Sequence, residues 1–454
     1  MSSTITVPAP AAIELPRLQT HHYPSDEERS HPSSPHEEPP EGAVVFTPPN
    51  VSSVKWQLLS MNFSIFLGGI NDAATGALVP YLQPAYSVGL LFIAVVYLVN
   101  FLGWSIAALT NVHLTARLGT GGVMLLGGTL QLLAHALQFW KPPFALFVFT
   151  YLLAGLGIAY QDAQANSFVG GVHDAHRWLG VLHAVYGAGA LVSPLIATKI
   201  ASSTPHWNHF YLVAFGIALL NVALIATAFW GGIGKPPAGA RDRATSDLKK
   251  TVSNRTVILI SLFFFLYVGT EVTAGGIPPP TPPGPPLLTT SGWVVEFLIR
   301  ERGGHASSVG YVASGFWGGL TLGRLLLADI TFRLGERRMV FVYLVLSLAV
   351  QLTFWLVPNL LANAVMISLL GFFIGPFFPT GISVATKLLP KELHVPAIGF
   401  MSTTGQAGSA AFPFLTGAVA AKVGVGVLQP VLVALLAAQA LLWAAVPRVS
   451  RRTV

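Results

Sequence analysis

The chain has 454 residues, of which 53% are hydrophobic and only 9% are charged. Because an average soluble domain carries roughly 25% charged residues, this composition excludes an ordinary soluble protein and predicts a membrane protein. The formal net charge of +7 comes from basic residues dispersed between apolar blocks, a pattern typical of topology signals and not of a nucleic-acid interface. Because the chain has no cysteine, disulfides, thiolate metal sites and cysteine nucleophiles are excluded.

The N-terminal segment, residues 1–54, is rich in proline, serine, glutamate and histidine and has few large apolar residues. Such a segment buries too little surface to offset the entropy of ordering the chain, so we predict a disordered cytoplasmic tail. It lacks the basic start, apolar core and small-residue cleavage site of a signal peptide. We expect its four histidines to be solvated and not to bind a metal.

From Trp56 onward, apolar runs alternate with short polar breaks, and the runs approach or exceed the roughly 20 residues that cross a bilayer. We therefore predict an all-α membrane protein with twelve transmembrane helices in two six-helix, pseudo-symmetric halves. The predicted spans are 57–80, 89–110, 122–140, 144–170, 178–200, 209–231, 255–276, 305–328, 338–357, 361–388, 396–421 and 425–446.

Lysine and arginine are distributed unevenly between these spans. The break at 232–254 holds five of them, whereas the breaks at 81–88 and 358–360 hold none. Because cytoplasmic loops carry the excess of basic residues, we predict that both termini are cytoplasmic. We expect the plasma membrane to hold the protein, with a vacuolar or other internal membrane as the alternative. The predicted parts are an N-terminal half at 55–231, a cytoplasmic linker at 232–254, a C-terminal half at 255–447 and a short tail at 448–454.

The two predicted halves share short motifs at nearly constant offsets. Arg117-Leu118-Gly119 repeats 216 positions later as Arg333-Leu334-Gly335. In the fifth and eleventh spans, two glycines and a proline repeat at an offset of 219, which pairs Gly180, Gly189 and Pro194 with Gly399, Gly408 and Pro413. Parallel repeats of six helices indicate a transporter built from two halves.

A proline-rich stretch, IPPPTPPGPPLLTTSG at residues 277–292, interrupts the predicted seventh helix. Proline removes a backbone donor and clashes with the preceding turn, so this stretch cannot be membrane helix. It is either a loop outside the membrane or at a cavity edge, or a segment absent from the mature protein, such as an untrimmed intron. We prefer the second explanation, and sequencing the transcript decides between them.

Three carboxyl groups lie inside predicted spans, namely Asp72, Asp162 and Glu271. An ionised aspartate at the centre of a membrane helix costs about 2.5–3.5 kcal/mol, so these groups are expected to face protein or water. A carboxyl group that changes its charge with access to water can couple proton movement to conformational change. We predict proton coupling by these three residues; the alternative is a permanently protonated carboxyl that only joins two helices.

The stretch IAYQDAQANSF at residues 158–168 is unusually polar for a membrane span. Asp162 and Asn166 are four residues apart and share one helix face, whereas Gln161 and Gln164 share another face. The first pair is the better candidate for a central cavity, and the glutamines either contribute to it or bond an adjacent helix. The predicted substrate-binding residues are Asn71, Asn166, Gln161, Gln164, His183, Tyr186, Trp317 and Gln406.

The stretch GRLLLADITFRLGERR at residues 323–338 ends the eighth span. Asp329 and Arg333 are four residues apart, so they can pair with each other and with nearby helix ends. We predict that they form a latch that holds one conformation. His113 stands where the first half would need its own acidic residue, so the first-half latch is expected to be weaker. The predicted latch residues are Arg117, Arg324, Asp329 and Arg333.

Together these residues resemble the major facilitator superfamily, and GRLLLADITFRLGERR is similar to its cytoplasmic loop motif. The resemblance covers residues 55–448. The motifs IND at 70–72 and DAQANSFV at 162–169 are similar to the fucose permease branch of proton symporters and its fungal relatives. This resemblance implies that Asp72 and Asp162, with Asn71 and Asn166 beside them, carry proton coupling and touch the sugar.

The chain departs from the bacterial pattern of that branch in its cavity residues. It has aspartate in place of glutamate at 162 and Ser167 in place of a proline. It also has His183 and Tyr186 where the pattern carries amides. The resemblance therefore implies retained coupling groups around an altered substrate cavity.

We interpret the chain as a secondary transporter, a proton-coupled symporter of a small polar solute such as a sugar, that works by alternating access. The alternatives are an efflux antiporter for a hydrophobic compound and a transporter-like nutrient sensor. No phosphate loop, paired-histidine metal motif or activated nucleophile is found, so we do not expect an enzyme or a cofactor. The expected partners are the solute, the proton and the lipid bilayer, with no nucleic acid, and the protein is expected to be a monomer.

Overall fold

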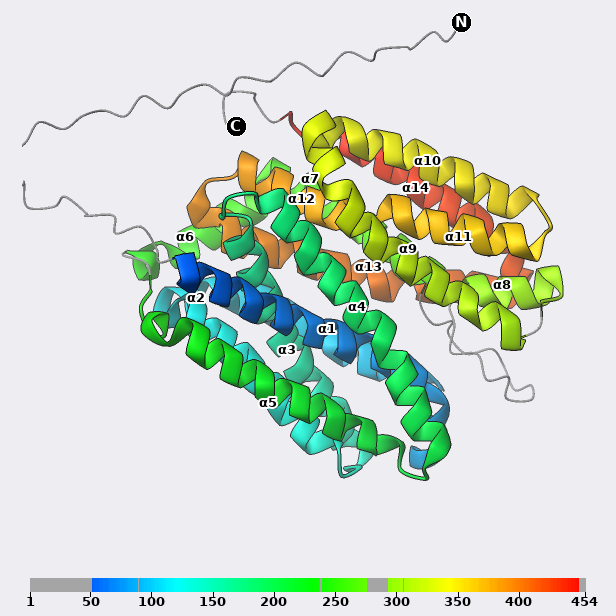
Figure 1. The fold of residues 1–454 in the computed structure, drawn as a ribbon, viewed down its shortest axis with the longest axis horizontal. Helices are drawn as coiled ribbons and strands as arrows, with labels where there is room; N and C mark the ends of the chain where they lie inside the picture. Colours follow the sequence, from blue (N-terminus) through cyan, green and yellow to red (C-terminus); the bar gives the residue numbers. More distant parts are fainter. Residues whose placement is uncertain (1–50, 89, 237–238, 276–292, 305, 449–454) are drawn as a thin grey trace, which may run out of the picture. The chain divides into compact units, whose positions relative to one another are not determined.

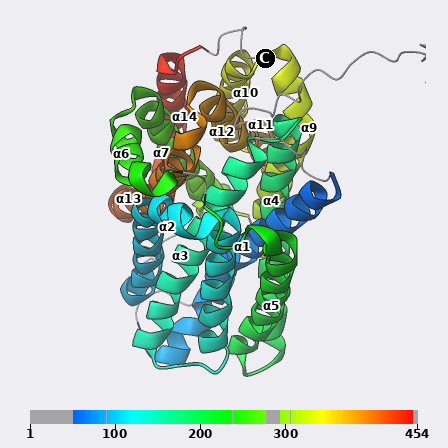
Figure 2. The same cartoon turned by 90° about the vertical axis from the view of Figure 1, so that its left-hand side faces the viewer.

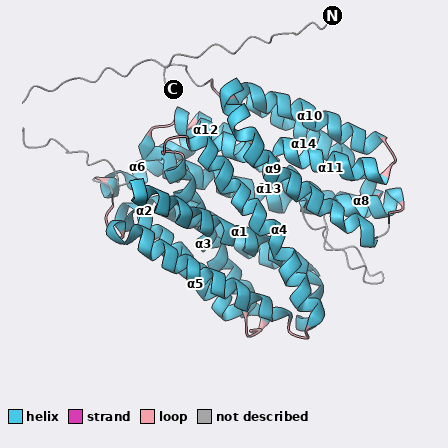
Figure 3. Ribbon diagram, in the orientation of Figure 1, coloured by secondary structure: helices cyan, strands magenta, loops and turns pink. Residues whose placement is uncertain are grey.

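The computed structural model describes residues 51–448 except 89, 237–238, 276–292 and 305. The described residues form helices joined by short loops, and none of them lies in a β-strand (Figure 3). Most of the predicted tail and the whole proline-rich stretch at 277–292 lie outside the described residues.

The first part of the chain forms long helices that follow the predicted spans closely between residues 144 and 229 (Figure 1). Their apolar composition explains these lengths, and the prolines inside them, Pro80 and Pro84 near the end of the first helix and Pro194 in the fourth, do not end the helices. The helices are α1 (Val51–Tyr86), α2 (Leu90–Gln138), α3 (Phe144–Val169), α4 (Ala175–Ser203) and α5 (Phe210–Phe229), with short 3-10 turns at Trp207–His209 and Trp230–Gly232.

The second part is also built of helices, one of which lies within the segment predicted as a linker. That helix, α6 (Ala240–Ser253), is polar and carries several basic residues. The others are α7 (Arg255–Gly275), α8 (Trp293–Arg302), α9 (Ala306–Leu334), α10 (Glu336–Leu356), α11 (Leu360–Ile374), α12 (Phe377–Leu388), α13 (His394–Val423) and α14 (Leu428–Ala445), with 3-10 turns at Lys391–Leu393 and Val425–Val427.

Eight helical segments among the described residues are long and apolar enough to cross a membrane. The longest of them, Val95–Gln138, covers most of two predicted spans. The expected break between those spans is replaced by a kink inside α2 at Gly119, where φ is 67°. Glycine is required there because φ is positive and because a Cβ atom would lie 2.6 Å from the carbonyl oxygen of Lys235.

Helices pack most extensively on partners from their own part of the chain. In the first part α1 packs on α4 and α2 on α3, and in the second part α7 packs on α13 and α9 on α11 (Figures 1 and 2). Gly189 of α4 lies against the backbone of Phe66, and Gly408 of α13 lies against the backbone of Phe265. These two glycines stand at matching positions of the predicted internal repeat, and each lets two helix backbones approach closely.

The two parts of the chain meet along a few helices. α4 contacts α9 and α12, and α13 contacts both α2 and α3. Some polar side chains of these helices, such as Asp162 of α3 and Ser402 of α13, lie where the two parts touch.

Candidate functional site

Asp162 lies in the middle of a polar cluster between α3 and α13. Asn166 Nδ2 donates a hydrogen bond to Asp162 Oδ1 at 2.9 Å, as their four-residue spacing indicates. Ser402 Oγ of α13 donates to Asp162 Oδ2 at 2.7 Å. Only 9% of Asp162 is exposed, so each carboxylate oxygen exchanges water for one protein donor.

His183 of α4 extends this cluster. Its Nε2 lies 2.9 Å from Asn166 Oδ1, and its ring packs on Phe378 of α12 at a centroid distance of 4.7 Å. The Asn166 amide thus bridges the Asp162 carboxyl and the imidazole. The cluster contains groups from α3, α4 and α13, and the serine was not singled out from sequence.

Asp72 belongs to a second group, on α1. Tyr186 Oη of α4 donates to Asp72 Oδ2 at 2.9 Å. Asn71 is buried beside it, with 5% of its surface exposed. Because His183 and Tyr186 are three residues apart on α4, this helix contacts the groups around both aspartates.

Glu271 of α7 faces Arg324 of α9 inside the protein. Both carboxylate oxygens lie 3.4 Å from Arg324 Nη2, and the side chains are 7% and 3% exposed. The same guanidinium donates to Tyr267 Oη at 3.1 Å and to the carbonyl oxygen of His183 at 3.1 Å. Arg324 therefore links α7, α9 and α4 from inside the protein, and its charge is paired with Glu271.

The two glutamines of the polar stretch in α3 contact α2 and not the cluster around Asp162. Gln131 Nε2 donates to Gln161 Oε1 at 2.7 Å. Gln164 Nε2 donates to Asn111 Oδ1 at 2.8 Å and to Thr115 Oγ1 at 2.6 Å. Their geometry is that of helix-joining residues, the second of the two possibilities that the spacing left open.

Trp317 and Gln406 are partly exposed and have local partners. Trp317 Nε1 of α9 donates to the carbonyl oxygen of Gly275 in α7 at 3.0 Å. Gln406 Oε1 accepts from Ser409 Oγ, also in α13, at 3.1 Å. Neither side chain bonds the groups around the aspartates in this structure.

Of the two kinds of partner predicted for Asp329, the structure shows the nearby helix end. Arg177 Nε and Nη2 donate to Asp329 Oδ1 and Oδ2 at 2.6 and 2.9 Å, and His176 Nε2 lies 3.0 Å from Oδ1. Among the described residues, Asp329 is thus paired with the start of α4 and not with Arg333. Asp329 faces the neighbouring helix end, and the bidentate arrangement suits the guanidinium of Arg177.

We expect Asp329→Asn to weaken the contact between α4 and α9, whereas Arg333→Gln should leave it unchanged. The side chains of Arg177 and Asp329 are 51% and 39% exposed. Because water screens such a pair, the equilibrium between conformations should shift only about two- to fivefold. Because the chain has no cysteine, spin labels can be attached to single introduced cysteines on α4 and α9. Their distance distributions would contradict the pairing if Arg333→Gln produced the larger shift.

Long apolar helices that enclose clusters of buried carboxyl, amide and basic groups define a multi-pass membrane protein with a polar interior. The profile of the Major Facilitator Superfamily matches residues 61–279 and 288–453. The chain belongs to the Major Facilitator Superfamily and is therefore a transporter and not an enzyme. The match is interrupted inside the proline-rich stretch.

Individual relatives agree with this family. The chain is 28% identical over 410 residues to "Bypass of stop codon protein 6" of Saccharomyces cerevisiae, covering 83% of this chain and 79% of the yeast protein. It has a TM-score of 0.68 with FucP in the outward conformation, at 16% identity over 87% of this chain and 99% of FucP. With the proton:xylose symporter XylE bound to 6-bromo-6-deoxy-D-glucose, the TM-score is also 0.68. The identity is 12%, and the match covers 88% of this chain and 97% of XylE. These structural likenesses establish the fold.

Proposed function

We propose that this transporter is a proton-coupled symporter of a small polar solute, with a sugar as the first class to test. The observation that carries the proposal is the Asp162 carboxyl, which is buried and bonded to Asn166 on its own helix and to Ser402 on α13. A buried carboxyl between two moving parts can take up a proton in one conformation and release it in another. FucP and XylE, which share the fold, support a polar solute as cargo.

The proposed architecture has twelve crossings in two halves. α2 supplies two crossings on either side of Gly119, α7 with α8 supplies the seventh, and α11 with α12 the tenth. The equivalent close contacts of Gly189 and Gly408 support this pseudo-symmetry. The basic α6 lies between the halves, which supports a cytoplasmic location for it and for both termini.

The proposed cycle uses the contacts that join the halves. In this conformation Arg177 and Asp329 hold the ends of α4 and α9 together, while Ser402 bonds Asp162. When the halves separate, the Asp162 carboxyl loses the serine donor, and a proton on the carboxyl removes the cost of a charge left without a partner. The polar clusters argue against a hydrophobic cargo, which an efflux antiporter would carry.

Ser402→Ala should make the separation of α3 and α13 depend less on pH. A bond to a charged acceptor is worth about 1.5–3 kcal/mol. Where Asp162 is ionised, the variant should therefore shift the equilibrium between joined and separated α3 and α13 by roughly tenfold or more. Where Asp162 is protonated, the shift should be small. Thr403→Ala is the matched control, because Thr403 Oγ1 donates to the carbonyl oxygen of Trp104 across the same boundary at 3.1 Å. That control should shift the equilibrium equally at every pH.

Distances between spin labels on α3 and α13, measured over a pH series, distinguish these outcomes. The other ionisable groups around Asp162 are His183, which it reaches through Asn166, and Asp72, and they are common to both variants. If Ser402→Ala changed the α3–α13 distances equally at every pH, Asp162 would have no role in the proposed coupling.

Transport itself is tested in proteoliposomes with an imposed pH gradient and labelled sugars. Gradient-driven accumulation supports the proposal. Uptake that ignores the gradient contradicts proton coupling, and binding of a sugar without uptake would favour a nutrient sensor.

A further inference from the structure

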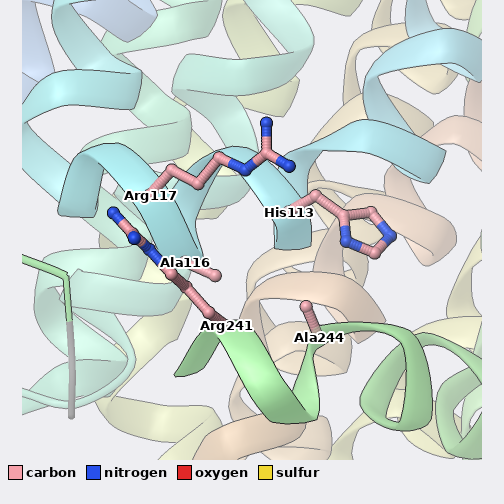
Figure 4. Close-up of a pocket in the computed structure, with 5 residues that line it drawn as sticks. All are labelled: His113, Ala116, Arg117, Arg241 and Ala244. Carbon is pink, nitrogen blue, oxygen red and sulfur yellow. The ribbon is translucent and has the colours of Figure 1, made fainter. Parts of the chain in front are cut away.

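A cavity of about 350 Å³ lies between α2 and α6, away from the aspartate clusters. It is lined by His113, Ala116 and Arg117 of α2 and by Arg241 and Ala244 of α6 (Figure 4). Three of these five side chains are basic and none is acidic. The volume is in the range of small-molecule sites.

The walls of this cavity are fixed by packing. Ala244 is only 3% exposed and packs with Val112 and Ala116 of α2. The loop before α6 is also tied to α2, because the Gly234 amide donates to the carbonyl oxygen of Leu118 at 2.9 Å. The two alanines line the cavity together with the three basic side chains.

The two guanidinium groups have unused donors. Among the ion pairs found in the described part of the chain, none includes Arg117 or Arg241. The acidic Asp247 of α6 is instead paired with Lys250, at 3.7 Å. Arg241 lies in the first turn of α6, where the helix dipole favours an anion, and Asp242 shares that turn without lining the cavity.

We propose that this cavity binds a phosphate group and thereby holds α6 against α2. Arginine presents paired donors that match phosphate oxygens, and two arginines with an imidazole offer more such donors than a carboxylate can accept. The phosphate can belong to a lipid headgroup at the membrane surface or to a soluble compound, since both present the same oxygens. The proposal does not depend on proton coupling or on the identity of the solute.

The test uses the purified full-length protein and its single-residue variants Arg117→Gln, Arg241→Gln and Lys249→Gln. Lys249 is exposed on the same helix but does not line the cavity, so its variant controls for the loss of one positive charge. Thermal unfolding is followed with inorganic phosphate against chloride at equal ionic strength. It is followed in parallel in phosphatidylcholine vesicles with and without phosphatidic acid.

We expect phosphate or phosphatidic acid to stabilise the wild type and Lys249→Gln, with at least a tenfold loss of apparent affinity in each arginine variant. A response to inorganic phosphate without a response to phosphatidic acid identifies a soluble source, and a response to phosphatidic acid alone identifies the lipid. The charge-retaining variants Arg117→Lys and Arg241→Lys should respond more strongly than the glutamine variants. Equal responses of wild type and arginine variants, or no response to either probe, overturn the proposal.

Discussion

Replacing Asp162 with asparagine is expected to reduce gradient-driven solute accumulation to the level of protein-free vesicles. Asparagine keeps the size of the side chain and one oxygen for Ser402, but it cannot take up a proton. Exchange of labelled for unlabelled solute should continue, because exchange needs no net proton movement. The measurement is uptake and exchange in the same proteoliposomes.

Asp329→Asn is the matched control, since it makes the same chemical change at the contact with Arg177 and outside the polar clusters. It should keep accumulation dependent on the gradient. If Asp162→Asn still followed the gradient while Asp72→Asn did not, the proton would be carried by the aspartate that bonds Tyr186, and the role of Asp162 would be structural.

Glu271→Gln should lower the stability of the protein more than Asp162→Asn or Asp329→Asn does. It leaves the buried Arg324 guanidinium without its counter-charge, and breaking a buried pair costs about 3–5 kcal/mol. The remaining acceptors, Tyr267 and two carbonyl oxygens, do not neutralise the charge. A clear fall in the thermal midpoint of the purified protein is the expected result.

The double variant Glu271→Gln with Arg324→Gln should recover part of that loss, because neither charge then remains unpaired. A double-mutant cycle on the thermal midpoint measures the coupling. Additive effects would show that the two residues act separately. Transport by the more stable double variant then tests whether Glu271 is also a proton carrier, as the sequence predicts.

The correspondence between sequence and structure is best for features that depend on neighbours along the chain. Apolar runs long enough to cross a bilayer indicated the helices from 144 to 229 to within three residues. The bond between Asp162 and Asn166 follows from helical spacing alone. Gly119 lies in the break predicted between the spans 89–110 and 122–140. The structure instead has one kinked helix there, which runs from Leu90 to Gln138 without a loop.

The sequence by itself determined that the chain is a helical membrane protein and which polar residues share a helix face. Only the tertiary structure decided what each face meets. Ser402 reaches Asp162 across 240 positions and Arg177 reaches Asp329 across 152, while Arg324 turns inward to Glu271. The physical reason is that helical periodicity fixes the direction of a side chain relative to its own axis, whereas its partner depends on how separate helices pack.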